Sequence, residues 1–342
     1  MRSRWLMTLV GALWLSSWTP AAAQGVGQLY DSVSASVVVI KARGREAADT
    51  GGGLVSFGET GSGVLIADGK VITAAHVVQA MDEIDVEFLG IKESVPARVI
   101  ASEPSADLSL LELERVPSGA KPARLADSDT ARVGNEVIVI GAPYGLSHSL
   151  TTGYISARWA PNTVYRRLPM AEFFQTNAAI NTGNSGGPMF NMSGEVIGIV
   201  SHNISKSGGS EGLGFVVTIN TAKRFLLTKD HFWSGMEGEL ISGTVAAIMN
   251  VPQPVGFLVT AVAKNSPSAQ AGIRGGAQKA TIAGQEYTVG GDIILKIAGV
   301  TLSAVTDMVK MREKLGDLSS GSPYGITVLR GGKLLELTGH VP

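Results

Sequence analysis

A single serine, Ser185, stands among three glycines and a proline in the stretch Asn181–Phe190, which reads N-T-G-N-S-G-G-P-M-F. A serine hydroxyl becomes a nucleophile only when a base takes its proton, and its attack on a carbonyl creates an oxyanion that needs N–H donors. Glycine lets the backbone turn its amides toward one point without a side-chain clash. We therefore predict Ser185 as a nucleophile. The segment Gly183, Asn184 and Ser185 would form the oxyanion hole, chiefly through the amides of its first and last residues.

The base for this serine should be a histidine, and one histidine directly follows a predicted strand. His76 lies in V-I-T-A-A-H-V-V, where small residues allow a tight turn that presents the ring. His148 in a polar loop, His231 in a linker and His340 near the terminus are expected to be surface or structural residues. Asp107 precedes the apolar strand in A-D-L-S-L-L. A buried carboxylate of this kind can hold the imidazole in the required tautomer.

Three blocks carry these residues in the order His, Asp, Ser: T-A-A-H-V-V, A-D-L-S-L-L and G-N-S-G-G-P. They resemble the active-site blocks of trypsin-like serine proteases, and their order is typical of the chymotrypsin fold. Longer stretches, such as G-S-G-V-L-I-A-D-G-K-V-I-T-A-A-H-V-V and G-L-G-F-V-V-T-I-N, are similar to the HtrA/Deg family of bacterial and organellar proteases. The resemblance implies a mostly β fold, with a chymotrypsin-like double β-barrel followed by a C-terminal PDZ domain.

The resemblance also implies a substrate pocket. The residues that it assigns to substrate binding are Ala179, Ser201, His202, Asn203, Gly214 and Phe215. Ala179, six residues before Ser185, would form the floor, and Asn203 stands where a glycine would keep the pocket open. Because the floor carries no charge, we expect small aliphatic side chains to be preferred over Lys or Arg. By the same analogy, Ser201 would also form a hydrogen bond with Asp107.

The C-terminal part of the sequence resembles a PDZ domain of the HtrA type. The stretch similar to a loop that captures a peptide's terminal carboxylate comprises Trp233, Ser234, Gly235 and Met236. The stretch Ser303–Leu315 would be the helix beside the peptide groove, and an extended peptide would add to an exposed sheet edge. Ser234 replaces a commonly apolar residue, and residues 277–290 form an insertion. No ligand preference therefore follows from the resemblance.

The elements that must position these residues are predicted from local patterns. Short strands separated by turns run from Ser34 to about Val217, and Asp68-Gly69 predicts a hairpin. The glycine-rich stretch Gly51–Gly63 lacks the Gly-Lys-Ser/Thr ending of a phosphate loop, so we expect a flexible loop running into a strand. A helix from Thr221 to about Lys229, with Asn220 as a possible cap, would close the protease domain.

The 342 residues are predicted to divide into a signal peptide at 1–23, a trypsin-like domain at 24–229 and a PDZ domain at 230–342. A basic start and an uncharged run from Trp5 to Trp18 are typical of a secretory signal. Since this run is shorter than the roughly 20 residues that span a bilayer, cleavage after Ala23 is favoured over an uncleaved anchor. The chain has no cysteine, which excludes thiol catalysis, and its net charge of −1 does not indicate nucleic-acid binding.

Together these features predict a periplasmic or secreted serine endopeptidase that degrades unfolded or misfolded exported proteins. Ser185 would attack, His76 would transfer the proton and Asp107 would orient His76. No metal or other cofactor is expected. The resemblance implies a homotrimer regulated by C-terminal peptides at the PDZ domain, and the loop 161–170 could switch the site. Two alternatives stay open: a chaperone or peptide-binding scaffold with secondary proteolysis, and a narrow processing protease.

Overall fold

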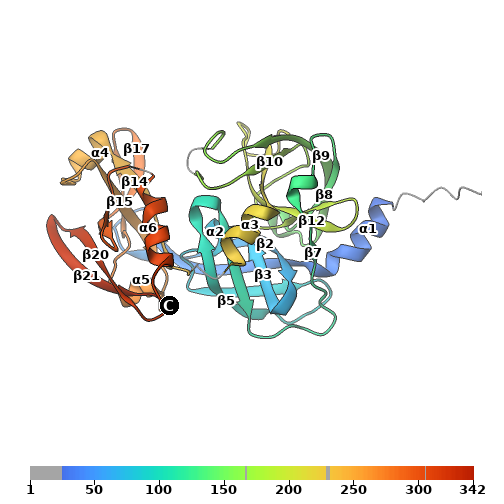
Figure 1. Ribbon diagram of the computed structural model, residues 1–342, viewed down its shortest axis with the longest axis horizontal. Helices are drawn as coiled ribbons and strands as arrows, with labels where there is room; N and C mark the ends of the chain where they lie inside the picture. Colours follow the sequence, from blue (N-terminus) through green and yellow to red (C-terminus); the bar gives the residue numbers. More distant parts are fainter. Residues whose placement is uncertain (1–24, 166–167, 229–231, 305) are drawn as a thin grey trace, which may run out of the picture.

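The computed structural model describes residues 25–165, 168–228, 232–304 and 306–342. The predicted signal peptide and the predicted domain junction at residues 229 and 230 lie outside these ranges. Two β-barrels are followed by a smaller C-terminal unit, which lies at the end of the barrels opposite to helix α1 (Val26–Val33) in Figure 1. Within the described ranges, no helix has the length and apolar character needed to cross a membrane.

The first barrel consists of six antiparallel strands that close in the order β1-β2-β3-β6-β5-β4. The strands are β1 (Val37–Ala47), β2 (Leu54–Ile66), β3 (Lys70–Thr73), β4 (Glu83–Phe88), β5 (Val95–Glu103) and β6 (Leu108–Leu113). The predicted hairpin at Asp68-Gly69 is confirmed, because both residues lie at positive φ between the paired strands β2 and β3. The expectation of a loop through Gly63 is wrong, since β2 begins at Leu54 and pairs with β1 over its first eleven residues.

The second barrel is closed by the pairing of β11 with β12, and the short strand β7 adds to its side. Its strands are β7 (Arg124–Leu125), β8 (Glu136–Gly141), β9 (Ser149–Trp159), β10 (Phe173–Thr176), β11 (Pro188–Asn191), β12 (Glu195–Asn203) and β13 (Gly214–Thr218). The helix that follows, α3 (Ile219–Leu226), starts two residues earlier than predicted, with Thr218 as its N-cap. Asn220 is therefore inside the helix, where its side chain donates to Asp127 (2.7 Å) instead of capping.

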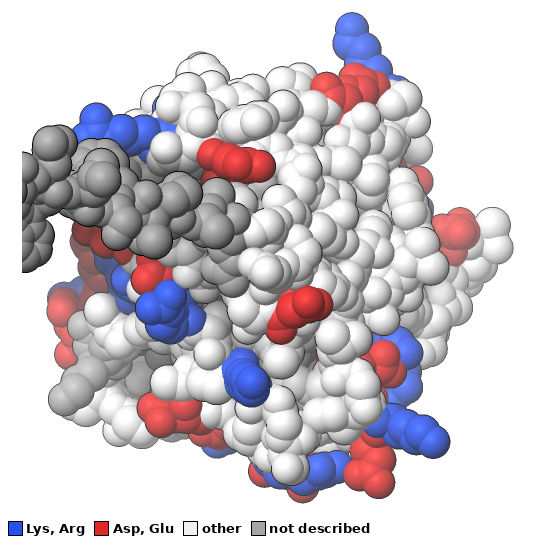
Figure 2. All heavy atoms as spheres, turned by 90° about the vertical axis from the view of Figure 1, so that its right-hand side faces the viewer, with Lys and Arg blue, Asp and Glu red and all other residues white. Residues whose placement is uncertain are grey.

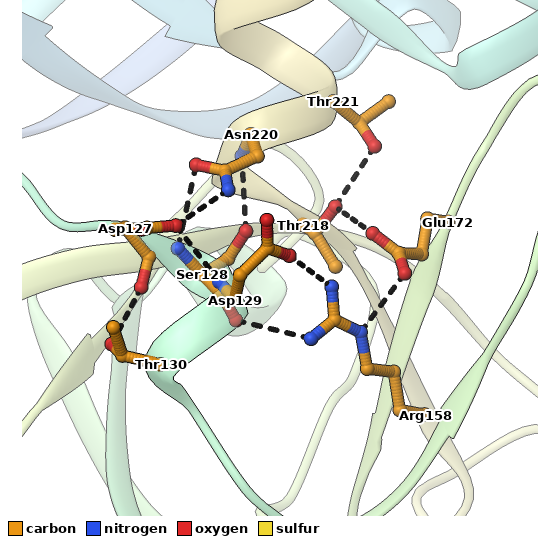
Figure 3. A network of polar contacts seen from close by, with 9 residues as sticks. All are labelled: Asp127, Ser128, Asp129, Thr130, Arg158, Glu172, Thr218, Asn220 and Thr221. Carbon is orange, nitrogen blue, oxygen red and sulfur yellow. Dashed lines mark hydrogen bonds and ion pairs between the residues drawn. The ribbon is translucent and has the colours of Figure 1, made fainter.

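A polar network ties this helix to the barrel, as Figure 3 shows. Arg158 of β9 donates to Glu172 (2.9 Å) and to Asp129 (2.5 Å). Glu172 in turn accepts a hydrogen bond from the hydroxyl of Thr218 (3.1 Å). The two carboxylates raise the pKa of the Arg158 guanidinium above its ordinary value, so the cation is permanent at this joint.

Apolar residues fill both barrels because they alternate along the strands. In β4, for example, Ile84, Val86 and Phe88 are buried while the residues between them are partly exposed. One buried cluster runs through both barrels and includes Ile72 of β3 and Phe215 of β13. The barrels therefore pack as one body, and the candidate catalytic residues lie on segments from both.

The C-terminal unit is a β-sheet in the order β14-β15-β18-β20-β21, with β19 paired to β18 and a separate β16–β17 hairpin. Its strands are β14 (Met236–Ser242), β15 (Val255–Val262), β16 (Gln278–Ile282), β17 (Gln285–Val289), β18 (Ile293–Ile297), β19 (Val300–Thr301), β20 (Pro323–Arg330) and β21 (Lys333–His340). Its helices are α4 (Gly243–Ile248), α5 (Pro267–Gln270) and α6 (Asp307–Gly316). Among the residues that the structure describes, β14 pairs with β15 alone, so no described strand covers its other edge, the kind of edge to which a peptide strand can add. The sequence insertion at 277–290 is the β16–β17 hairpin.

Candidate active site

His76 is presented by the short helix α2 (Ala75–Val78), which begins directly after β3. The small residues Ala74 and Ala75 are fully buried, and the hydroxyl of Thr73 donates to the carbonyl of Ser62 (2.7 Å). The chain can therefore turn tightly here. The imidazole remains 43% exposed, which leaves it accessible to solvent and to a substrate.

Asp107 holds His76 through its carboxylate. The imidazole Nδ1 lies 2.9 Å and 3.0 Å from the two carboxylate oxygens, and the backbone N–H of His76 donates to the same group (3.1 Å). Asp107 stands after a 3-10 turn with φ +55°, a left-handed conformation that aspartate tolerates better than most residues. This bend turns the buried carboxylate toward α2.

His76 and Asp107 shift each other's pKa toward the charged form. Burial by itself raises the pKa of Asp107, but the His76 imidazole and the hydrogen bonds to the carboxylate outweigh it, so the pKa of Asp107 is lowered. Burial likewise works to lower the pKa of His76, but the Asp107 carboxylate outweighs it and raises that pKa. Glu59 and Glu237 add smaller contributions in the same direction. Asp107 is thus an ionised acceptor, and Nδ1 of His76 carries the proton.

Ser185 lies in the turn that precedes β11, and its hydroxyl donates to the carbonyl of Ser201 (3.2 Å). The hydroxyl of Ser201 itself contacts Asp107. Among the described residues no hydrogen bond joins Ser185 directly to His76. The structure therefore brings His76 and Asp107 into direct contact, and it links Ser185 to them through Ser201.

The segment before Ser185 is held in a conformation that requires glycine. Gly183 has φ +100°, and a Cβ at this position would collide with the carbonyl of Ala142. The amide of Asn184 is used within the turn, where it donates to Asn181 (3.0 Å). The amides of Gly183 and Ser185 have no acceptor in the described part of the chain, which leaves them available for an oxyanion.

The residues predicted for the substrate pocket lie together at the ends of β12 and β13. Asn203 pairs with Gly214, and His202 pairs with Phe215. The amide of Asn203 donates to the carbonyl of Ile180 (3.1 Å), next to the predicted floor at Ala179. The Asn203 side chain thus bridges β12 to the segment that carries the floor. None of these residues carries a permanent charge.

The predicted carboxylate loop of the PDZ domain lies against the protease domain, at a residue that the sequence did not single out. The side-chain amide of Gln79 donates to Ser234 Oγ (3.3 Å) and to the carbonyl of Met236 (3.0 Å). The Trp233 indole donates to the main-chain carbonyl of Gln79 (2.8 Å). Gln79 follows α2 directly, so the loop is three residues from His76 along this path. The only available signal was a polar residue after an apolar helix.

Gly235 lies inside this loop with φ +71°, and a Cβ there would collide with the side chain of Ser266. Its carbonyl accepts a hydrogen bond from Ala263 (2.8 Å), and the carbonyl of Ser234 accepts one from Ser268 (3.1 Å). The loop is therefore fixed on both sides, by its own domain and by Gln79.

Comparison with known proteins gives matches to both parts of the chain. Residues 61–199 match the family described as trypsin-like peptidase domain. Residues 213–341 match the PDZ domain family. The first match contains His76, Asp107 and Ser185, and the second contains the predicted carboxylate loop.

Two relatives illustrate the sequence similarity. A probable periplasmic serine endoprotease, DegP-like, of Pseudomonas putida (strain GB-1) is 35% identical over 286 residues, which cover 81% of this chain and 54% of the relative. The periplasmic serine endoprotease DegP of Salmonella typhimurium is 33% identical over 295 residues, which cover 84% of this chain and 58% of the relative. The chain thus spans little more than half the length of these relatives.

Solved structures show the same fold. The HtrA-type protease AlgW with a tripeptide matches with a TM-score of 0.51 and 25% identity, over 91% of this chain and 94% of that one. AlgW with a decapeptide matches with a TM-score of 0.53 and 24% identity, over 92% and 97%. The chain therefore contains a trypsin-like peptidase domain and one PDZ domain, with DegP-like serine endoproteases as its homologues and HtrA-type proteases as its structural neighbours.

Proposed function

We propose that this protein is a serine endopeptidase that cleaves unfolded or misfolded exported proteins through an acyl-enzyme. Ser185 attacks the peptide carbonyl, and His76 takes its proton and then gives it to the leaving amine. Asp107 keeps His76 in the tautomer with Nδ1 protonated. The amides of Gly183 and Ser185 hold the oxyanion, each contributing about 3 kcal/mol to the transition state. The observation that carries this proposal is the chain of contacts from His76 through Asp107 and Ser201 to Ser185.

The proposed place of action is the periplasm or the exterior of the cell, after removal of a signal peptide. Two observations support this. The names of the relatives describe them as periplasmic. The first residues of the chain, a basic start followed by an uncharged run and A-A-A, are typical of an export signal.

The proposed pocket accepts small aliphatic side chains. Ala179 offers no charge, and the bond from Asn203 to Ile180 limits the space beside it. A peptide library with every residue at the position before the cleaved bond tests this. Preference for Ala, Val or Ile supports the assignment, and preference for Lys or Arg contradicts it.

The PDZ domain would bind peptide ends through the open edge of β14 and the loop at Trp233–Met236. Both features lie next to Gln79 and therefore next to α2. A peptide bound at this loop would therefore change the contacts of the helix that presents His76. This arrangement supports regulation of the protease by the PDZ domain.

A homotrimer built by the protease domains is also proposed, and the surface around α1 supports it. Tyr30 of α1 donates to the carbonyl of His148 (3.1 Å), and the adjacent segment leaves Tyr144 and Leu146 about two-thirds exposed. Figure 2 shows that the end of the molecule carrying α1 has a largely uncharged centre, with scattered charges of both signs around it. Light scattering of wild type and Leu146→Asp tests this: a mass three times that of the chain, lost in the variant, supports the trimer.

Degradation of unfolded casein by wild type and by Ser185→Ala tests the activity itself. Cleavage by wild type alone supports the proposed nucleophile, and equal cleavage by both proteins contradicts it. If wild type prevents casein aggregation without cleaving it, the chaperone alternative is correct. If casein stays intact while one native exported protein is cut, the narrow processing protease is correct.

A further inference from the structure

The buried hydroxyl of Ser201 lies between a carboxylate and a second imidazole. Its Oγ contacts Oδ2 of Asp107 and lies 3.0 Å from Nδ1 of His202. A hydroxyl has one proton to donate, and an ionised carboxylate can only accept. The proton of Ser201 therefore goes to Asp107. Nδ1 of His202 must then carry a proton of its own and donate it to Ser201 Oγ.

The other nitrogen of His202 agrees with this tautomer. Nε2 is buried and has no hydrogen-bond partner among the described residues. With the proton on Nδ1, Nε2 is a bare acceptor, and no N–H group is left unpaired. A second proton would create a buried donor without an acceptor. Burial accordingly lowers the pKa of His202, despite the nearby Asp107 carboxylate, so the ring stays neutral.

Three aromatic rings fix the orientation of this imidazole. Phe215 stacks on it with centroids 5.2 Å apart and an interplanar angle of 11°. The ring centroid of Tyr165 lies 4.4 Å from that of His202, and Phe173 contacts the imidazole edge-on with centroids 5.6 Å apart. The ring is thus packed around its body while Nδ1 faces Ser201.

We propose that His202 is a positioning residue, whose Nδ1–H fixes the Ser201 hydroxyl on Asp107 and so extends the chain His76–Asp107–Ser201 by one link. This role belongs to the side chain, and it is separate from the substrate-binding role that the family resemblance assigns to His202. It rests on the proposed serine-protease function. The carbonyl of Ser201 also accepts a hydrogen bond from the hydroxyl of Ser185. A fixed Ser201 therefore holds Asp107 and Ser185 in place relative to each other.

Two substitutions separate the hydrogen bond from the ring packing. His202→Phe keeps an aromatic ring in the cluster but removes the donor. His202→Asn loses the ring but places an amide nitrogen close to the position of Nδ1, where it can donate to Ser201. With a small-peptide substrate, we expect His202→Phe to lower kcat roughly fivefold, the value of one neutral hydrogen bond, with little change in KM. His202→Asn should recover a substantial part of that kcat. Thermal unfolding confirms that each variant is folded.

Both substitutions are then introduced into the Ser201→Ala protein, and kcat is measured again. If His202 acts through the Ser201 hydroxyl, His202→Phe causes no further loss of kcat in the Ser201→Ala protein. An equal fivefold loss in both backgrounds would overturn the proposal, as would a His202→Phe enzyme with wild-type kcat, or an Asn variant no better than the Phe variant. These results are distinct from failure of the proposed function, which would appear as an inactive wild type or an active Ser185→Ala protein.

Discussion

At the scale of single residues, Ser201 connects the candidate catalytic groups. Its hydroxyl contacts Asp107, and its carbonyl accepts a hydrogen bond from the Ser185 hydroxyl. Asp107 can reach both Ser201 and His76 because its backbone adopts a left-handed conformation at the start of β6. A substitution at any of these positions therefore changes the orientation of the others.

Asp107→Asn tests the orienting role of the carboxylate. The amide is nearly the same size, but it presents an N–H to the imidazole and favours the wrong tautomer of His76. In Ser-His-Asp proteases the corresponding change lowers kcat about 10⁴-fold, and we expect a similar loss here. Peptide hydrolysis measures it, and circular dichroism checks the fold. A loss below tenfold would show that Asp107 does not orient the base.

The raised pKa of His76 predicts the acid limb of the activity profile. A raised pKa means that the folded enzyme holds the proton more tightly than a free imidazole, whose pKa is 6.5. The base is therefore more than half protonated at pH 6.5, and kcat/KM should reach half of its plateau above that pH. Since the charge of Glu237 contributes to this shift, Glu237→Gln should move the limb to lower pH. A midpoint at or below 6.5 in wild type would contradict the assignment.

At the scale of secondary-structure elements, His148 joins the segment after η5 (Pro143–Gly145) to the start of β1. Its Nε2 lies 2.9 Å from the carbonyl of Val37, so Nε2 carries the proton. Nδ1 is buried and has no partner among the described residues. Burial lowers the pKa of His148, because a second proton would have no acceptor. The sequence placed His148 in a polar loop. The structure buries its side chain because it contacts Val37, which lies 111 residues away along the chain.

His148 makes the stability of the protease domain depend on pH. The folded pKa is below the unfolded value of 6.5, so the unfolded chain binds this proton more readily. The contribution of neutral His148 is complete above pH 6.5 and is lost as the pH falls from there toward the folded pKa. His148→Gln keeps a donor for Val37 but cannot titrate. The melting temperatures of wild type and variant should therefore diverge below pH 6.5, with wild type falling more. Parallel curves would contradict this role.

At the scale of the whole molecule, contacts between the protease and PDZ domains surround the helix that carries His76. The buried Gln79 is bonded to Ser234 and Met236 of the PDZ domain and to Ser102 of β5 (2.5 Å). Around it, ion pairs join Asp82 to Lys264 and Glu103 to Arg312. The carboxylates of Asp82 and Glu103 are largely buried, so these two ion pairs and the buried amide of Gln79 together form the polar part of this interface.

Gln79→Leu should weaken the docking of the PDZ domain. The side chain keeps its approximate size, but three hydrogen bonds are lost and buried polar groups lose partners, which costs roughly 2 kcal/mol. Calorimetry of the full chain should show a PDZ transition that separates from the protease transition. The matched control is Gln270→Leu, which removes a single exposed bond within α5 and its neighbours. If both variants melt like wild type, Gln79 does not hold the domains together.

The sequence by itself determined the identities of the nucleophile, base and carboxylate candidates, and the order of the two domains. The three candidates follow from glycine-rich turns, strand ends and apolar strands, which are local patterns that one short segment can specify, whereas the domain order follows from the resemblance to the HtrA/Deg family. The strand at Leu54 and the start of α3 were misplaced for the complementary reason. Their ends depend on partners, β1 in one case and the cap at Thr218 in the other.

Only the tertiary structure decided which polar groups meet. The contact between Ser201 and Asp107, 94 residues apart, was predicted only by the family resemblance, and the contact between Gln79 and Ser234, 155 residues apart, was not predicted. No local pattern could link them. The tautomer of His202 likewise depends on three aromatic rings, a hydroxyl and a carboxylate from different segments. Hydrogen-bond direction is a property of the assembled network, because a hydroxyl has one proton to give and the folded chain determines which acceptor receives it.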